Sequence, residues 1–251
     1  MNHLTNHTAV SLLGLFLLPA WFAVAEAGAG AAIANRTGDS ITTPEAANEH
    51  LKYWGLDIII SNNGFGLGTF YRKQFTTDLA WSLSLAVSGA KDDREMDYFD
   101  PITGQSITPG KLNRFLVIPL LASFEYRLFS DDIVDTFRPY VNAAVGPTMV
   151  YMMPYVTITT SSTGAVVTNQ VDFFNAIGKG HPYYTVGSFI GAGANFGSEK
   201  TNVFGVNIRY YFIYLMNGGL PSLYDERTGE VNSYKSDFGG FAITLNLSLS
   251  L

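Results

Sequence analysis

The sequence predicts an all-β protein, an eight-stranded antiparallel up-and-down transmembrane β-barrel. From Phe241 to Leu251, every odd position is large and apolar, whereas every even position is small or polar. This period of two is typical of a strand with one apolar and one polar face. Similar segments recur along the chain, and a stretch typical of an export signal precedes them all. Strands that cross a membrane must close into a barrel, because no unpaired edge can face lipid.

Composition supports this fold and excludes several classes of function. The 251 residues fit one domain plus a targeting segment. Only 14% of residues are charged, against roughly 25% in ordinary domains, while 14 Tyr and 18 Phe can supply interfacial girdles. The absence of cysteine excludes disulfides and thiolate metal sites. A net charge of −6 provides no basic surface for nucleic acid.

The first 50 residues are predicted to lie outside the barrel. Residues 1–25 have the apolar core of a secretory signal peptide, with small-residue cleavage sites after Ala25 or Ala27. No Lys or Arg precedes that core, so an uncleaved membrane helix is the alternative. Residues 26–50 are small and polar, which predicts a flexible periplasmic leader. The barrel is then expected to occupy residues 51–251.

Eight segments in that region have the composition of strands. They lie at about 51–61, 65–75, 79–90, 114–129, 139–155, 183–197, 203–215 and 237–251. The connections after the second, fourth and sixth strands are short, whereas those after the third, fifth and seventh are long. Short periplasmic turns and long external loops are typical of outer-membrane barrels, so we expect this protein in the bacterial outer membrane.

The three long loops contain hairpin motifs. Asp100–Gly104 and Asp225–Gly229 are nearly identical, and Ser161–Gly164 is related to them. Such spacing suits a type I turn closed by a left-handed glycine, so we expect the strands to continue above the membrane as a rim of hairpins. The predicted exposed tips are Asp100, Thr103, Gly104, Thr163, Gly164, Asp225, Thr228 and Gly229. A ten-stranded barrel that includes Val156–Phe174 is the alternative, but Thr157–Ser162 is too polar to face lipid.

Charged residues indicate which face of the barrel is which. Five of them occupy the polar face of their strands and are predicted to form a paired network inside the lumen: Asp57, Arg72, Glu125, Arg127 and Arg209. A mid-membrane Arg or Lys facing lipid costs about 2–4 kcal/mol, which disfavours the opposite assignment. The one outward charge, Lys73, lies near a turn where it can reach the interface. A soluble barrel would have the reverse polarity.

An eight-stranded barrel is just wide enough for side chains to fill it. We therefore expect the charge network to plug a polar lumen, with a gated ion path as the alternative. Inward glycines such as Gly191 and Gly205 leave room for the long arginines.

Residues that could support catalysis or metal binding are sparse. His181 lies in a loop without a serine at motif spacing, and His50 lies in the leader. The acidic run Asp92–Asp97 lacks the spaced ligands of a calcium loop, so we interpret it as a solvated loop. We expect no cofactor, no metal and no enzymatic activity.

Residues 113–151 resemble a known family. The stretches Phe115–Leu121, Phe124–Arg127 and Arg138–Pro147 are similar to the small outer-membrane β-barrel domains of Bacteroidetes-type bacteria. The resemblance implies an outer-membrane barrel but no particular activity. Such barrels usually end in an aromatic residue that the barrel-assembly machinery recognises, whereas this chain ends in Leu251.

Together these observations predict a non-enzymatic barrel with a structural, adhesive or ligand-binding role exercised through its exposed rim. A narrow pore for ions or small solutes is the main alternative, and a lipid-modifying enzyme at the rim is a third. The expected partners are outer-membrane lipid, lipopolysaccharide and the barrel-assembly machinery, and the external ligand is not specified by the sequence.

Overall fold

The computed structural model describes residues 51–101, 104–130, 136–160, 166–197, 203–216 and 218–250. The predicted signal peptide and leader lie outside the described residues, so both remain predictions.

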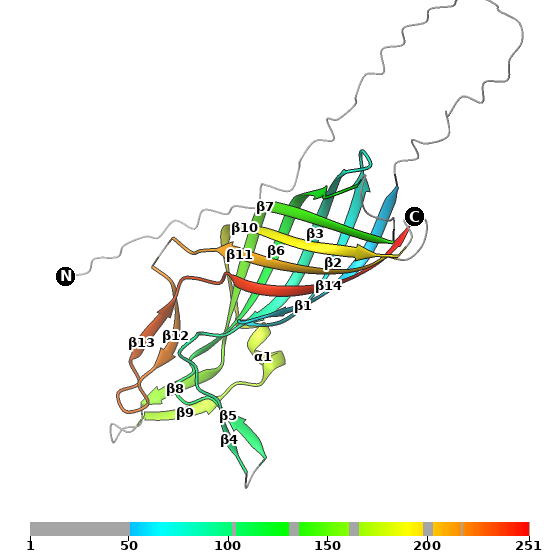
Figure 1. The fold of residues 1–251 in the computed structure, drawn as a ribbon. Coiled ribbons are helices and arrows are strands. Elements are labelled where there is room, and N and C mark those ends of the chain that lie inside the picture. Colours follow the sequence, from blue (N-terminus) through cyan, green and yellow to red (C-terminus); the bar gives the residue numbers. More distant parts are fainter. Residues whose placement is uncertain are drawn as a thin grey trace, which may run out of the picture. The chain divides into compact units, whose positions relative to one another are not determined.

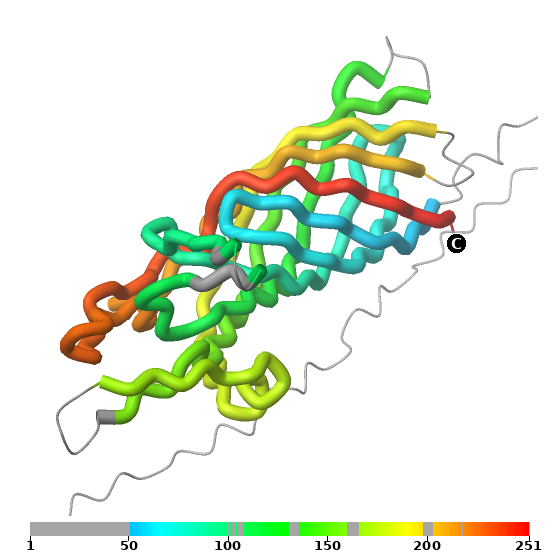
Figure 2. Tube along the Cα trace, turned by 90° about the horizontal axis from the view of Figure 1, so that it is seen from below, coloured from blue at the N-terminus to red at the C-terminus, as the bar shows by residue number. Residues whose placement is uncertain are grey.

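Eight strands form one closed antiparallel barrel, which confirms the predicted fold class (Figures 1 and 2). They are β1 (Lys52–Ser61), β2 (Gly64–Gln74), β3 (Leu79–Ala90), β6 (Asn113–Arg127), β7 (Phe137–Pro154), β10 (His181–Phe196), β11 (Val203–Ile213) and β14 (Gly240–Ser250). Each pairs with its neighbours along the chain, and β14 closes the ring on β1. Every predicted strand overlaps one of these eight.

The two ends of the barrel differ as the sequence predicted. At the end where β1 starts and β14 finishes, which we call the short-turn end, few residues separate β2 from β3, β6 from β7, and β10 from β11. The longer connections lie at the opposite end, the long-loop end, together with the tight turn of Asn62 and Asn63 between β1 and β2.

Three hairpins and one short helix extend from the long-loop end (Figure 1). The hairpins are β4 (Tyr98–Asp100) with β5 (Gln105–Ile107), β8 (Val156–Thr160) with β9 (Val166–Gln170), and β12 (Leu220–Tyr224) with β13 (Val231–Lys235). The helix α1 (Phe173–Ile177) was not predicted; the Asp172 side chain caps it by accepting a hydrogen bond from the Phe174 amide.

Each hairpin is a separate two-stranded sheet, so hairpins are present as expected but the barrel strands do not continue into them. Between β11 and β12 the break has a clear cause. Gly218 and Gly219 have φ of +82° and +87°, a conformation that turns the chain away from the strand direction and that favours glycine. The β8–β9 pair likewise forms its own sheet, which excludes the ten-stranded alternative.

The outward face of the barrel is an apolar belt. In β14, Ile243 is 47% exposed whereas the adjacent Thr244 is fully buried, and the same alternation runs through β1, β3 and β11. The outward positions of β14 from Phe241 to Leu249 extend about 26 Å along the strand at 3.3 Å per residue. At a strand tilt of about 40° this length spans about 20 Å along the membrane normal, somewhat less than the apolar band of about 25 Å in outer-membrane barrels.

Aromatic rings gather at both edges of this belt. At the long-loop end the Tyr210 ring lies 4.9 Å from that of Phe212 and 4.8 Å from that of Phe241. At the short-turn end the ring contacts are Phe137–Phe196, Phe196–Phe204 and Tyr71–Trp81. Lys73 is near the short-turn edge, with its ammonium 5.7 Å from the Phe75 ring. The outward lysine therefore lies at the edge of the belt.

Candidate functional site: a charged lumen under a packed loop cap

Arg72 and Glu125 form an ion pair inside the barrel. Arg72 extends from β2 and Glu125 from β6, with β3 between them, and their Nη2 and Oε2 atoms are 3.1 Å apart. Asn195 of β10 donates from Nδ2 to Glu125 Oε1 at 3.2 Å. A continuous polar chain therefore runs from β2 through β6 to β10, across the lumen.

A second ion pair joins β1 and β11. Arg209 Nη1 is 3.6 Å from Asp57 Oδ2, and Asn246 donates from Nδ2 to the other carboxylate oxygen. The Arg209 guanidinium also lies 4.7 Å from the centre of the Phe189 ring and 3.4 Å from the Tyr211 hydroxyl. Asp57 and Arg209 are 3% and 7% exposed, so both charges of the pair are removed from bulk solvent.

Arg127 is the fifth residue of the predicted network. It is buried near the short-turn end, where its backbone amide donates to the Asp78 carbonyl. It lines the same pocket as Arg72 and Glu125, and its pairing with a carboxylate stays a prediction. Strand parity places Arg127 inside the barrel but does not define which carboxylate it faces.

Uncharged polar residues lie around the two ion pairs. Asn207 and Thr244 are fully buried, and Tyr140 and Asn142 are nearly so. Inward glycines make this density possible: a Cβ on Gly191 would approach Asn142 Oδ1 to 2.6 Å, and one on Gly193 would approach the Val206 carbonyl to 2.4 Å. These glycines therefore bring side chains and backbone into closer contact than the sequence analysis anticipated.

The half of the lumen toward the long loops is apolar, which corrects the prediction of a polar lumen throughout. Ile59 packs with Ala86 and Ala242, and Leu121 packs with Ala144 and Phe189. These residues occupy inward positions, where the sequence analysis expected polar groups.

Two partly open cavities of about 40 Å³ each extend into the barrel. The one at the short-turn end is bordered by Arg72, Glu125, Arg127, Arg138 and Tyr140, among others. The other lies toward the long loops and has mainly apolar neighbours, including Ile59, Val117, Tyr211 and Phe238. Each has room for a few water molecules, since one water needs about 10–15 Å³ on this scale.

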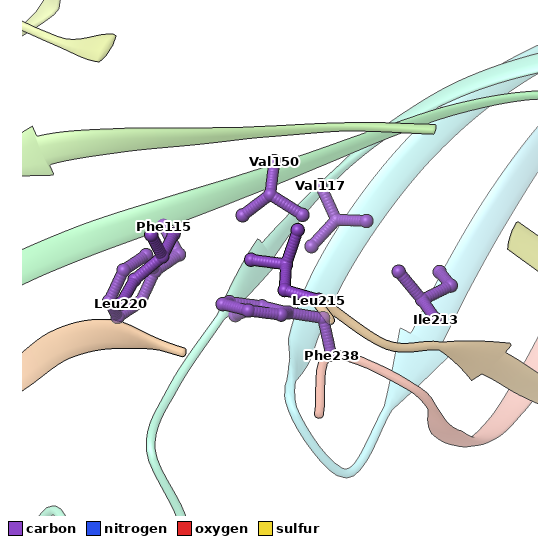
Figure 3. Packing of buried hydrophobic residues seen from close by; sticks show 8 residues of the cluster. Phe115, Val117, Val150, Ile213, Leu215, Leu220 and Phe238 are labelled. Carbon is purple, nitrogen blue, oxygen red and sulfur yellow. The ribbon is translucent and has the colours of Figure 1, made fainter. Parts of the chain in front are cut away.

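A hydrophobic cluster closes the barrel at the long-loop end. Its side chains come from β3, β6, β7, β11 and β12, from the segment between β11 and β12, and from the segment before β14. Figure 3 shows Phe115 beside Leu220, with Val117, Val150, Leu215 and Phe238 between them and Ile213. The Phe115 and Phe238 rings meet edge to face with centres 5.3 Å apart. The buried members are Ala90, Phe115, Val117, Val150, Ile213, Leu215, Leu220 and Phe238.

Above this cluster, polar contacts tie the loop after β3 to the β12–β13 hairpin. Asp92 is 4% exposed and accepts hydrogen bonds from Ser222 and Ser233, while Arg94 forms an ion pair with it at 2.9 Å. Arg94 also donates to the Tyr234 carbonyl at 3.0 Å. We call this group, Asp92 with Arg94, Ser222 and Ser233, the loop clasp.

The loop clasp strongly perturbs its carboxylate. Burial alone would raise the pKa of Asp92, but hydrogen bonds from Arg94 and Ser222 and the charge of Arg94 outweigh burial and lower that pKa to about 2. The interpretation of this acidic run as a solvated loop is therefore wrong for Asp92. A second pair, Lys111 with Glu95 at 2.6 Å, is also shielded from solvent.

The predicted loop tips are only partly described. Gly104 and Gly229 have φ of +67° and +73°, the left-handed conformation expected for the residue that closes each turn. In the β12–β13 turn, the Asp225 carboxylate accepts from the Arg227 amide at 2.8 Å, and Thr228 accepts from the Glu230 amide at 3.3 Å. Asp100 ends β4. Thr103, Thr163 and Gly164 lie outside the described residues.

The structure also brings two of the hairpins together. A Cβ on Gly229 would lie 3.3 Å from Ile158 and 3.5 Å from Val166, so the turn of the β12–β13 hairpin lies against the β8–β9 hairpin. These two hairpins therefore pack against each other rather than extending as independent arms.

The remaining candidates for chemistry are isolated. His181 is exposed at the first residue of β10. In the part of the chain that the structure describes, no group of three or more His, Cys, Asp or Glu residues is placed to hold a metal ion. The described residues also include no helix long and apolar enough to cross a membrane.

No protein-family model matches the chain, and no curated protein matches it. Among solved structures it is similar to Neisserial surface protein A (TM-score 0.42, 12% identity, 80% of this chain and 96% of that chain). It is also similar to the outer membrane protein OprG from Pseudomonas aeruginosa (TM-score 0.41, 10% identity, 80% and 94%). A third similar structure is the outer membrane enzyme PagL (TM-score 0.34, 13% identity, 79% and 98%). The resemblance of residues 113–151 to the Bacteroidetes-type family stays a prediction.

Proposed function

We propose that this protein is a bacterial outer-membrane barrel with a plugged lumen. Its role is structural, adhesive or ligand-binding, is exercised through the packed loops at the long-loop end, and involves no catalysis. The outward apolar belt with its two aromatic edges supports a membrane location, because apolar side chains can face lipid without the free-energy cost of facing water.

The observation that carries the proposal is the pair of ion pairs inside the barrel. Arg72–Glu125 and Asp57–Arg209 each join two strands that are separated by a third. Each ion pair therefore passes through the lumen rather than along the barrel wall. The apolar layer and the hydrophobic cluster lie beyond them toward the long loops. Breaking either ion pair would leave a buried charge without its partner, so spontaneous opening of the lumen would cost free energy.

The packed loops support a role at the exposed surface. The loop clasp and the contact between two hairpins hold the β8–β9 and β12–β13 sheets in place, so a partner meets a preformed surface. Preorganisation of this kind lowers the entropic cost of binding. Outer-membrane lipid and lipopolysaccharide surround the barrel in this proposal, and the barrel-assembly machinery inserts it.

Single-channel recording in planar bilayers tests the plug. Wild-type protein should give no conductance steps, because the two ion pairs, the apolar layer and the hydrophobic cluster all lie in the path. Folding of each sample is checked by its mobility on SDS gels before and after boiling, since closed barrels resist unfolding until heated. Steady conductance by the wild type would overturn the plug.

A narrow pore remains the second candidate, and the cavity at the short-turn end favours it. Arg72, Arg127 and Arg138 border that cavity together with Asp78 and Glu125, so three cations against two carboxylates would give an open path a weakly positive mouth. In the same recordings, a pore of this kind would show anion selectivity that decreases when Arg138 is replaced by glutamine.

A further inference from the structure

The barrel wall is uneven between β10 and β11. β10 begins at His181 and pairs with β7 from that residue onward, but its pairing with β11 begins only at Gly187, opposite Ile213. Beyond that point, the Thr185 hydroxyl donates to the Tyr214 carbonyl at 2.7 Å. Within the described residues, the part of β10 from His181 to Val186 therefore has no ladder partner on its β11 side.

A groove of about 740 Å³ lies at this break in the wall. Its size falls within the 300–1,000 Å³ typical of sites for small ligands. Tyr184 and Val186 of β10 line one side, and Phe212, Tyr214 and Met216 line the other. These side chains are strongly exposed, with Met216 at 90% and Tyr184 at 75%. We call this feature the wall groove.

The floor of the wall groove is part of the barrel interior. Ile213 and Leu215 line the groove, yet they are only 3% and 6% exposed and belong to the hydrophobic cluster under the loops. Tyr211 and Ile213 also border the apolar cavity. The groove thus ends on buried apolar side chains of the hydrophobic cluster.

A second outward groove provides a comparison within the same molecule. It has a volume of about 360 Å³ and is lined by residues that include Trp54, Phe204, Leu247 and Leu249. The strands there are continuously paired, Trp54 with Leu249 and Phe204 with Leu247. This second groove therefore lies on a part of the wall where the strands are continuously paired.

We propose that the wall groove binds one acyl chain of a lipid from the surrounding membrane leaflet. This inference rests on the proposed membrane location. The groove opens from the lipid-facing belt at its aromatic edge, where Tyr210 contacts Phe212 and Phe241. A chain would lie along Tyr184 and Phe212 and end against Ile213 and Leu215, while the lipid headgroup stays at the level of the aromatic edge. Continuity with the belt favours lipid over a protein partner, because lipid is already in contact with both rims of the groove.

Photo-crosslinking in vesicles tests this site. The protein is inserted into phosphatidylcholine vesicles that contain a small fraction of a phospholipid with a diazirine near the end of one acyl chain. After irradiation and digestion, adducts are located by mass spectrometry. We expect labelling of residues 184–188 and 212–216 several-fold above labelling around Trp54 and Leu247, saturating at one lipid per barrel. Even labelling of the two grooves would overturn the proposal.

Ser188→Trp fills the groove from its floor, and Ile190→Trp is the matched control. Both positions are on the outward face of β10, but only Ser188 lines the wall groove. We expect Ser188→Trp to reduce groove labelling about fivefold and Ile190→Trp to leave it unchanged. Equal labelling in the two variants would contradict a specific site. Val186→Trp serves in place of Ser188→Trp if that variant does not fold.

The outcome separates this inference from the proposed function. A wild-type barrel that inserts and shows the heat-dependent mobility shift, yet labels evenly, overturns the acyl-chain site alone. A barrel that does not insert into vesicles overturns the membrane location and the acyl-chain site with it.

Discussion

Removing Asp57 should unbalance the centre of the barrel. Its carboxylate lies 3.6 Å from Arg209 Nη1 and is 3% exposed. At an effective dielectric constant of 20, two unit charges at that distance attract by about 5 kcal/mol. Asp57→Ala leaves the Arg209 charge with the Tyr211 hydroxyl and the Phe189 ring as its remaining neighbours in the described structure. We expect a loss of about 3–5 kcal/mol, the range for removing one partner of a buried ion pair.

Three variants measured together isolate the interaction energy between Asp57 and Arg209. The free energy of unfolding of Asp57→Ala, Arg209→Met and the double variant is obtained from urea titrations of the protein folded in lipid vesicles. Because an apolar replacement of both partners removes both desolvation costs, the double variant should be far more stable than the sum of the single losses predicts. The reasoning is refuted if Asp57→Ala costs less than about 1 kcal/mol, or if the two single losses simply add.

Three other predictions follow from the belt, the loop clasp and the export signal. Leu85→Arg, near the middle of β3, should destabilise the folded barrel by about 2–4 kcal/mol in vesicle refolding. Leu79→Arg, on the same face but near the interface, should cost about 0–1 kcal/mol. Equal costs would contradict the depth assigned to the belt. Because the pKa of Asp92 is lowered to about 2, the loop clasp should keep its full contribution to stability above pH 4 and lose it as the pH falls toward 2. The NMR shift of the Arg94 amide, which donates to Asp92, should titrate with a midpoint near 2, and a midpoint near 4 would exclude the clasp. N-terminal sequencing of membrane-derived protein should begin beyond residue 25; an intact first methionine would favour an uncleaved anchor.

The alternation along each strand was predictable because it is local. Leu83 and Leu85 face outward and Asp57 and Arg209 face inward, as their parity within single strands requires. The hairpin motifs were predictable for the same reason, since Asp225 and Gly229 form their turn with each other.

The partners of the lumen charges were not predictable, because they depend on how far each strand is shifted relative to strands that are not its neighbours. Arg72 and Arg127 both occupy inward positions of their strands. Only the closed barrel shows that Glu125 pairs with Arg72. The apolar half of the lumen did leave a trace in the sequence: the inward positions of β6 are apolar from Phe115 to Leu121.

The loop clasp left no local trace. Asp92 lies in an acidic run typical of solvent-exposed loops, and its partner Ser222 is 130 residues away along the chain. The wall groove was missed for a related reason, since it arises from unequal lengths of β10 and β11 that only the pairing reveals.

The central claim, a barrel with lipid outside and a filled polar layer inside, is tested most directly by spin-label accessibility along β14. The chain has no cysteine, so single cysteines can be placed at each position from Ile243 to Leu247 without a background label. In vesicles, labels at 243, 245 and 247 should collide with dissolved oxygen as lipid-exposed sites do, whereas labels at 244 and 246 should be shielded from both oxygen and a water-soluble nickel complex. A profile without a period of two, or one in which the even positions are exposed to lipid, would contradict the account.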